Sequence, residues 1–282
     1  MHITKDSQSP PLTIKQALAQ AVLELKHGSD PRLDAQWLLL KILNQKEVSW
    51  LIAHGDNQID DDKLELFLQL VARRTRGEPL AYLLKEWEFY GRKFVVNEAV
   101  LVPRPSTERL VDEALDYIKK LVTRRHQTQV IIPLLIADIG TGSGCIAITI
   151  GLEIEKWMKA EGLKVDWRII ATDVSAAALK VARQNAKLFD VTDRIDLVPG
   201  DILQPIRDKK IDLIVSNLPY VPSAELDSPE LLDSDKAGLR FEPRLALDGG
   251  EDGLVFIQQL LKSDLPIIYE TVGGKVNNKN LV

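Results

Sequence analysis

Hydrophobic and polar positions follow two different periods along this chain of 282 residues, and the period changes near residue 80. Before that point the apolar residues recur at helical spacing, and Thr13 with Gln16 indicates a capping box. Asp30-Pro31 indicates an N-cap followed by proline at the first helical position. We therefore expect a small bundle without a catalytic cluster, with helices at 12–26, 31–43, 48–53 and 61–75. The second helix is expected to bury one stripe made of Leu33, Trp37, Leu40 and Leu43.

Gly77-Glu78-Pro79 breaks the helical pattern, and shorter apolar runs follow it. Residues 87–103 indicate a hairpin or two short strands, with turns at Gly91 and Asn97. From residue 131 onward, strands alternate with helices, which predicts an α/β domain whose parallel sheet is covered on both faces. The expected strands are 134–138, 168–172, 194–198 and 211–216, with 265–271 as a candidate fifth. The expected helices are 107–123, 145–159, 176–188 and 253–261.

Composition and charge narrow the class of protein. Hydrophobic residues make up 45% and charged residues 27%, which is ordinary for a globular domain. The net charge of −5 gives no global attraction to nucleic acid or to an anionic membrane, so we expect neither as a partner. No apolar run reaches bilayer length, and residues 1–11 lack the apolar core of a signal peptide. The single cysteine, Cys145, excludes an internal disulfide and favours a reducing compartment, so a cytoplasmic enzyme is expected.

The first candidate for chemistry is a glycine-rich turn between a strand and a helix. Gly140, Gly142 and Gly144, with Thr141 and Ser143 between them, allow the backbone to approach a ligand closely. The spacing departs from the dinucleotide fingerprint, which would need glycine at position 145. On its own, such a turn could equally close an ordinary strand–helix corner.

Acidic residues at the ends of the next two strands favour a ligand site over an ordinary corner. Asp173 is placed to accept hydrogen bonds from ribose hydroxyls, and Asp201 to accept one from an adenine amino group, with Ile202 over the adenine face. Open α/β sheets bind ligands at the carboxyl ends of their strands. No Walker lysine is present to cradle phosphates. The pattern therefore favours S-adenosylmethionine as cofactor, and no metal is expected.

The second candidate is the turn Asn217-Leu218-Pro219-Tyr220, which follows a later strand. The Asn217 side-chain carbonyl and the Leu218 backbone carbonyl can each accept a proton of one –NH₂ group. Pro219 keeps Leu218 extended, and Tyr220 offers a flat face for a planar amide or base. Taken alone, the four residues could be an ordinary proline turn. Beside the glycine turn, they predict methyl transfer to a nitrogen.

These residues resemble the HemK/PrmC family of class I methyltransferases, which methylate the glutamine of the Gly-Gly-Gln motif in peptide chain release factors. The resemblance covers about residues 12–262. It is carried by ADIGTGSGCIAI and the acceptor turn, by residues 76–115 and 241–254, and by PRLDAQWLL in the helical part. It implies three regions: a substrate-recognition bundle at 1–80, a linker and hairpin at 81–106, and a Rossmann-like methyltransferase domain at 107–282.

By position, the resemblance implies cofactor contacts for Gly140 to Gly144, Asp173, Asp201, Ile202 and Asn217. It implies substrate contacts for Asn217 to Tyr220, with catalytic roles for Asn217, Pro219 and Tyr220. The segment Arg104 to Glu108 is expected to cap the following helix rather than to order a cofactor lid. A class 1 release factor is the expected partner and a monomer the expected state.

The sequence departs from the family pattern at several points. Leu218 stands where the family usually has proline, Ser106 where it has glutamate, and Lys85 where it has glycine. The family continues beyond its fifth strand with two more strands. After Leu261 we expect those two to be absent here, which would leave strand 211–216 less covered.

Two other functions stay open. An exocyclic amine presents the same –NH₂ geometry as an amide, so an adenine N6-methyltransferase acting on RNA or DNA is one alternative. A shortened, non-catalytic protein that binds the cofactor or the release factor is the other.

Overall fold

The computed structural model describes residues 11–25, 30–129, 132–229 and 237–281. Contacts divide the chain into two compact units. One comprises residues of Met1–Leu84 and Asp233–Phe241, and the other comprises residues of Lys85–Leu232 and Glu242–Val282. The chain therefore returns to the first unit in a segment that ends with the short helix η3 (Ala237–Phe241).

The first unit is helical, as the apolar spacing predicts. The capping box of Thr13 and Gln16 is present, and the Asp30 carboxylate accepts from the Leu33 N–H at 2.9 Å. Lys26, which was expected to belong to the first helix, lies outside the described residues. The helices of this unit in the described chain are α1 (Ile14–Glu24), α2 (Pro31–Leu43), α3 (Val48–Ala53), α4 (Asp61–Thr75) and α5 (Leu80–Leu84).

The buried face of α2 differs from the predicted one. Leu33 is 41% exposed, whereas Asp34 is buried. Asp34 turns inward because Arg74 of α4 donates to it at 2.7 Å, and both side chains are largely shielded from solvent. The apolar stripe shifts with this ion pair. Of the predicted set Leu33, Trp37, Leu40 and Leu43, only Leu40 is fully buried, and the face is instead formed by Ala35, Leu38, Leu39 and Leu40.

The second unit is built on a sheet whose described strands have the order β5-β4-β3-β6-β7-β8. All neighbours are parallel except β7 and β8, which are antiparallel. The predicted α/β arrangement is confirmed. The strands are β3 (Leu134–Ile139), β4 (Trp167–Asp173), β5 (Ile195–Pro199), β6 (Leu213–Ser216), β7 (Ile267–Thr271) and β8 (Lys275–Lys279).

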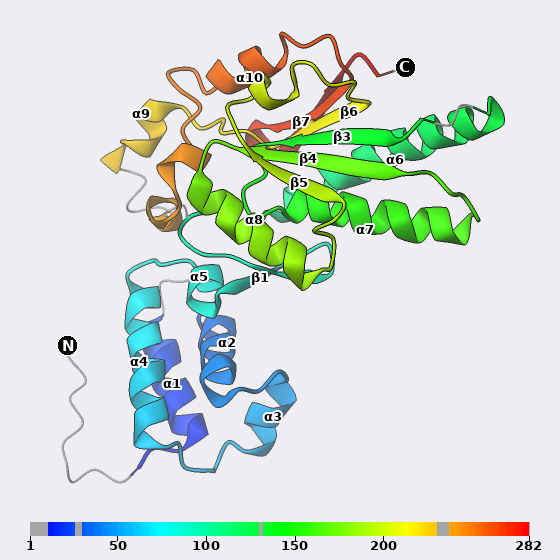
Figure 1. Ribbon diagram of the computed structural model, residues 1–282. Helices are drawn as coiled ribbons and strands as arrows, with labels where there is room; N and C mark the ends of the chain where they lie inside the picture. The colour runs from blue at the N-terminus through cyan, green and yellow to red at the C-terminus, as the bar shows by residue number, and fades with distance from the viewer. Residues whose placement is uncertain (1–10, 26–29, 130–131, 230–236, 282) are drawn as a thin grey trace. The chain divides into compact units, whose positions relative to one another are not determined.

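Helices cover both faces of this sheet (Figure 1). One face packs in a large apolar cluster with α6 (Pro105–Gln127), α7 (Cys145–Ala160) and the end of α8 (Ala176–Leu188). The other face packs with α10 (Val255–Leu260) and the 3₁₀ helix η1 (Gln204–Ile206). The remaining described elements are the hairpin strands β1 (Glu86–Phe89) and β2 (Arg92–Val95), α9 (Ser223–Leu226), and the 3₁₀ turns η4 (Arg244–Ala246) and η5 (Val272–Gly274).

Two expectations about strands are corrected. The hairpin forms around Gly91, and a turn forms at Asn97, whose side chain accepts from the Ala99 N–H at 3.0 Å; however, residues 98–103 form no strand. The strand expected at 211–216 was predicted to be less covered, and this is wrong. All four residues of β6 are buried, between β3 and β7. The polar strand β8, which carries no apolar alternation, forms the edge beyond β7.

A buried carboxyl lies inside the apolar run of β3. Asp138 is fully buried and accepts from the Thr141 hydroxyl at 2.7 Å and from the Ala147 N–H at 3.2 Å. These bonds tie the turn after β3 to the start of α7, while the second carboxyl oxygen has no partner among the described residues. Desolvation by burial raises the pKa of Asp138 to about 7, against the opposing effect of these hydrogen bonds.

Replacing Lys85 with glycine is expected to stabilise the protein by roughly 0.5–1 kcal/mol. Lys85 is exposed and has a φ of 62°, in the left-handed region where side chains are strained and glycine is not. This is also where the family resemblance leads one to expect glycine. Urea unfolding measures the change. Lys164→Gly is the matched control, since Lys164 is exposed without a positive φ and should lose stability; equal losses in both variants would contradict the argument.

Asp138→Asn is expected to change how stability depends on pH. The raised pKa means that between about pH 4 and about pH 7 the native carboxyl keeps a proton that the unfolded chain has lost, so this group's contribution falls as pH rises through that window. Asparagine does not titrate, so the variant lacks this pH-dependent contribution to stability. The unfolding free energy of the original protein minus that of the variant should fall by up to about 4 kcal/mol across the window. A pH-independent difference in urea unfolding would contradict it.

Candidate active site

A cavity of about 320 Å³ lies at the carboxyl ends of the parallel strands in the second unit. It gathers most of the residues predicted from the sequence. Gly144 and Tyr220 are not among its lining residues. The predicted residues that line it are Gly140, Thr141, Gly142, Ser143, Asp173, Asp201, Ile202, Asn217, Leu218 and Pro219.

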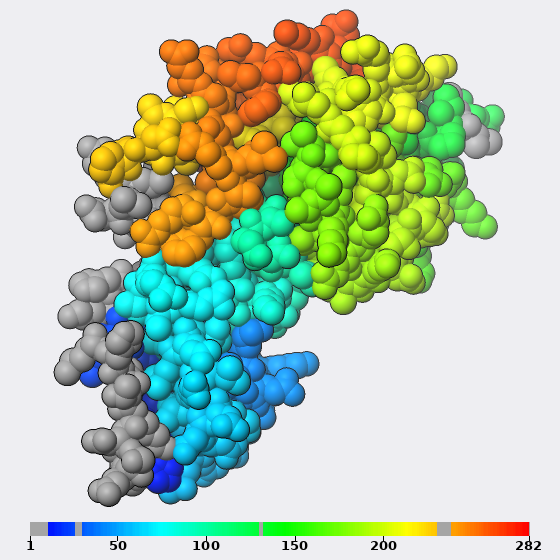
Figure 2. Space-filling view, turned by 60° about the vertical axis from the view of Figure 1, so that its left-hand side comes forward, coloured from blue at the N-terminus to red at the C-terminus, as the bar shows by residue number. Residues whose placement is uncertain are grey.

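The cavity is also lined by segments to which the sequence assigned no role. The added lining residues come from the loop after the hairpin (Ala99, Val100, Leu101 and Pro103) and from the segment after residue 242 (Pro243, Leu245 and Ala246). On the molecular surface the orange segment after residue 241 faces the green surface of α8 (Figure 2). These added lining residues are all apolar, as expected for a small-molecule site.

The glycine turn after β3 touches the acceptor turn directly. Gly140 has a φ of 75°, and a Cβ added there would lie 3.0 Å from Cδ2 of Leu218. Gly142 has a φ of 54°, and its missing side chain would meet nothing within 4 Å, so its backbone faces open space in the cavity. The first glycine therefore allows the two turns to approach, and the second leaves room for a ligand.

Asp173 holds the glycine turn at the end of β4. Its carboxylate accepts from the Gly142 N–H at 2.9 Å and from the Ser175 N–H at 2.8 Å. Burial raises the pKa of Asp173, and the backbone hydrogen bonds oppose that rise. Each carboxylate oxygen has further acceptor capacity, so ribose hydroxyls can still be bound here.

The segment after β5 is strained where it meets the cavity. Ile202 is 7% exposed and has a φ of 40°, which is costly for a β-branched residue. A Cβ added to Gly200 would lie 2.2 Å from Cγ of Pro205, so this turn is also closely packed. Strain of this kind is retained mainly at ligand sites. Asp201 lies between these residues, exposed and in the cavity lining.

The acceptor turn is anchored on both sides. The Asn217 Nδ2 donates to the Thr107 hydroxyl at 3.1 Å, and the Leu218 side chain is buried in the smaller apolar cluster. The Asn217 Oδ1 has no partner among the described residues and stays available as an acceptor. The Tyr220 hydroxyl lies 3.5 Å from Oε1 of Glu270 in β7, and burial raises the pKa of this tyrosine.

Residues 242–254 pack against the end of the acceptor turn and hydrogen-bond to the residue that follows it. The Val221 N–H donates to the Leu247 carbonyl at 2.9 Å, and the Gly249 N–H donates back to the Val221 carbonyl at 2.8 Å. A side chain at Gly253 would lie 2.5 Å from the Tyr220 carbonyl oxygen. At the start of this segment, Glu242 pairs with Arg104 and accepts from the Val102 N–H.

The segment Arg104 to Glu108 does not cap α6. Arg104 is the N-cap residue but makes no side-chain cap bond, and Glu108 instead accepts from the Tyr90 N–H at 2.7 Å. The residues that sequence reasoning missed are Thr107, Glu242 and Glu270. Thr107 and Glu242 lie in stretches quoted for the family resemblance, and the signal for Glu270 is one carboxylate in an otherwise apolar strand.

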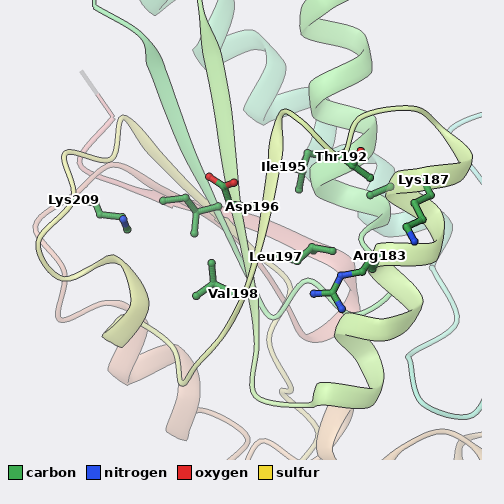
Figure 3. Close-up of a pocket in the computed structure, with 10 residues that line it drawn as sticks. Arg183, Lys187, Thr192, Ile195, Asp196, Leu197, Val198 and Lys209 are labelled. Carbon is green, nitrogen blue, oxygen red and sulfur yellow. The ribbon is translucent and has the colours of Figure 1, made fainter.

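A larger, shallower hollow of about 590 Å³ lies elsewhere, at the open edge of β5 (Figure 3). Arg183 and Lys187 of α8 and Lys209 lie around it. Its one carboxylate, Asp196, is paired with Arg168. Asp196 is the one charged lining residue on the edge strand itself, where charge hinders unwanted strand pairing. None of its lining residues comes from either predicted turn, so the smaller cavity is the candidate active site.

Cofactor fit can be tested on this cavity. The glycine turn leaves open space at Gly142, acidic side chains stand at the ends of two successive strands, and the lining offers no cluster of cations for a pyrophosphate. A nucleoside with a small charged tail suits these groups, which agrees with S-adenosylmethionine. No helix among the described residues is long and apolar enough to cross a bilayer.

The chain matches two family models, the PrmC N-terminal domain over residues 16–84 and the Methyltransferase small domain over residues 113–229. A release factor glutamine methyltransferase of Moorella thermoacetica is 38% identical over 245 residues, covering 86% of this chain and 77% of that protein. A bifunctional methyltransferase of Rickettsia felis is 36% identical over 261 residues, covering 86% of this chain. The chain spans only 46% of that longer protein.

Among solved structures, a ribosomal protein L11 methylase from Lactobacillus delbrueckii subsp. bulgaricus is 22% identical. The match covers 62% of this chain and 64% of that one, with a TM-score of 0.32. The relatives in sequence are much closer. On their identity and coverage, this chain has the class I methyltransferase fold and belongs to the release factor glutamine methyltransferase family.

Proposed function

We propose that this protein transfers a methyl group from S-adenosylmethionine to the side-chain amide nitrogen of the glutamine in the Gly-Gly-Gln motif of class 1 peptide chain release factors. The observation that supports it most is the orientation of Asn217. Its amide nitrogen donates to Thr107, which leaves Oδ1 as a free acceptor, and both Asn217 and Leu218 line the cavity. Two neighbouring acceptors suit a substrate –NH₂ group.

The chemistry needs positioning more than acid or base. An amide nitrogen is a weak nucleophile because its lone pair is delocalised into the carbonyl. When bound, S-adenosylmethionine supplies an electrophilic methyl group on a sulfonium, so no metal is required. Asn217 and Leu218 would hold both amide protons, which aims the nitrogen and raises its electron density. Such alignment lowers the barrier by several kcal/mol.

The remaining roles follow from where each residue lies. Asp173 would bind the ribose hydroxyls, Asp201 the adenine amino group, and Ile202 would cover the adenine face. Pro219 and Tyr220 would bound the acceptor amide. The helical region predicted at 1–80 would recognise the release factor, and we expect a monomer that works in the cytoplasm.

Mass spectrometry of a release factor incubated with the protein and labelled cofactor tests the proposal. One methyl group on the glutamine of the Gly-Gly-Gln peptide is the expected result. Label on ribosomal RNA but not on protein would instead favour an adenine N6-methyltransferase. Cofactor binding in calorimetry without any transfer would favour a non-catalytic binding protein.

Asn217→Ala is expected to lower methyl transfer by about 100-fold or more, because one of the two acceptors is lost. Cofactor affinity should stay within about twofold, since the glycine turn and Asp173 are unchanged. Initial rates and calorimetry measure the two quantities. Asn278→Ala is the matched control, an exposed asparagine of β8, and should leave both unchanged. Normal transfer by Asn217→Ala would contradict the assigned role.

Asp173→Asn is expected to weaken cofactor binding by about 10- to 100-fold, because hydrogen bonds to a charged acceptor contribute about 1.5–3 kcal/mol. The asparagine oxygen can keep only one of the two backbone bonds, to Gly142 or to Ser175, so urea unfolding is needed to establish that the variant is folded. Calorimetry with S-adenosylmethionine is the measurement. Unchanged affinity in a folded variant would remove Asp173 from the cofactor site.

A further inference from the structure

A buried carboxylate lies behind the acceptor turn. Glu270 of β7 is 0% exposed and accepts from the Ser106 hydroxyl at 3.2 Å and from the Tyr220 hydroxyl at 3.5 Å. No ion pair joins it to a cation in the described part of the chain. Burying a carboxylate without a counter-ion is costly unless hydrogen bonds satisfy it, so its position calls for an explanation.

Thr107 connects this carboxylate to Asn217. The Thr107 hydroxyl oxygen accepts from Asn217 Nδ2 at 3.1 Å, and the residue is 3% exposed. A hydroxyl that accepts one hydrogen bond still has its own proton to donate. Burial raises the pKa of Glu270, and side-chain hydrogen bonds from Thr107, Ser106 and Tyr220 act against that rise. Asn217 is therefore bonded to Thr107. Glu270, on which the Thr107 side chain acts, has a buried oxygen, Oε2, that no hydrogen bond satisfies in the described part of the chain. This oxygen is the acceptor available to the Thr107 proton.

The direction of these bonds decides which end of the Asn217 amide meets the substrate. An asparagine side chain can turn over with almost no change in shape, exchanging its –NH₂ for its oxygen. If the Thr107 proton were free, Thr107 could donate to the Asn217 oxygen and the –NH₂ would face the cavity. A cavity that presented –NH₂ would repel a substrate –NH₂ group.

We propose that Glu270 is a positioning residue, which commits the Thr107 hydroxyl as donor and so fixes Asn217 with its oxygen toward the acceptor pocket. This inference rests on the proposed transfer to an –NH₂ group. Through its bond with Tyr220, the same carboxylate also holds the far end of the acceptor turn. Selection for –NH₂ substrates then depends on a residue that touches neither substrate nor cofactor.

Steady-state kinetics of four variants test the inference. Glu270→Gln keeps the shape but can donate as well as accept, and Thr107→Val removes the hydroxyl from a side chain of similar shape. Each is expected to lower kcat by about 10- to 100-fold, with KM for the release factor and the cofactor Kd within about twofold. Thr107→Ser keeps the hydroxyl and should recover kcat to within about threefold. The double variant Glu270→Gln/Thr107→Val should be no slower than the slower single variant.

A spectroscopic readout separates this inference from the proposed function. In ¹⁵N–¹H spectra the side-chain –NH₂ of Asn217 should show one slowly exchanging proton, which is lost in Glu270→Gln and Thr107→Val. The Asn278 –NH₂ should not change. If the original protein transfers no methyl group but the spectra behave in this way, the proposed function fails and the bond network stands.

Three results would overturn the inference. The first is a wild-type kcat in Glu270→Gln. The second is a Thr107→Ser variant as slow as Thr107→Val. The third is an Asn217 signal that is unchanged in both Glu270→Gln and Thr107→Val. Urea unfolding of each variant confirms that the comparison is between folded proteins.

Discussion

The pairing of β3 with β6 is the constraint on which the rest of the site depends. Ile139 and Ser216 are the last paired residues of the two strands, and the Ser216 hydroxyl donates to the Ile139 carbonyl at 2.8 Å. The turns that follow therefore leave the sheet side by side. Gly140 then permits Leu218 to pack against the first turn, so the cofactor pocket and the acceptor pocket share one cavity. A slip in this register would separate them.

Buried carboxyl groups hold the turns in place. Asp138, Asp173 and Glu270 lie on three different strands, and burial raises the pKa of each. In an apolar sheet such groups cost free energy, and at these positions their oxygens accept from the turns that line the cavity. Burying these carboxyl groups lowers the stability of the sheet, but their hydrogen bonds fix the turns at its carboxyl end.

The sequence was sufficient for the parallel strands and for both turns because each has a local pattern, whereas the polar edge strand β8 has none. Apolar runs marked the strands buried on both faces, and the glycine spacing marked the first turn. Side chains that act on the site from a distance left no such pattern. Thr107 meets Asn217 from a helix far earlier in the chain, and Glu270 meets Tyr220 from a later strand. The inward turn of Asp34 likewise depended on Arg74, which the α2 periodicity could not reveal.

Two departures from the family pattern, Ser106 in place of glutamate and the C-terminal segment that forms the β7–β8 hairpin, meet beside Glu270. Ser106 stands where glutamate is usual, and a Cβ added to Gly274, in the turn between β7 and β8, would lie 2.5 Å from the Ser106 Cβ. The β7–β8 turn therefore closely covers this position, and a longer side chain would have to displace it. A glutamate would also bring a second carboxylate toward Glu270, and like charges at that distance destabilise each other. Serine instead supplies a donor to Glu270 at 3.2 Å, so the local change keeps the buried carboxylate hydrogen-bonded while the hairpin packs over it.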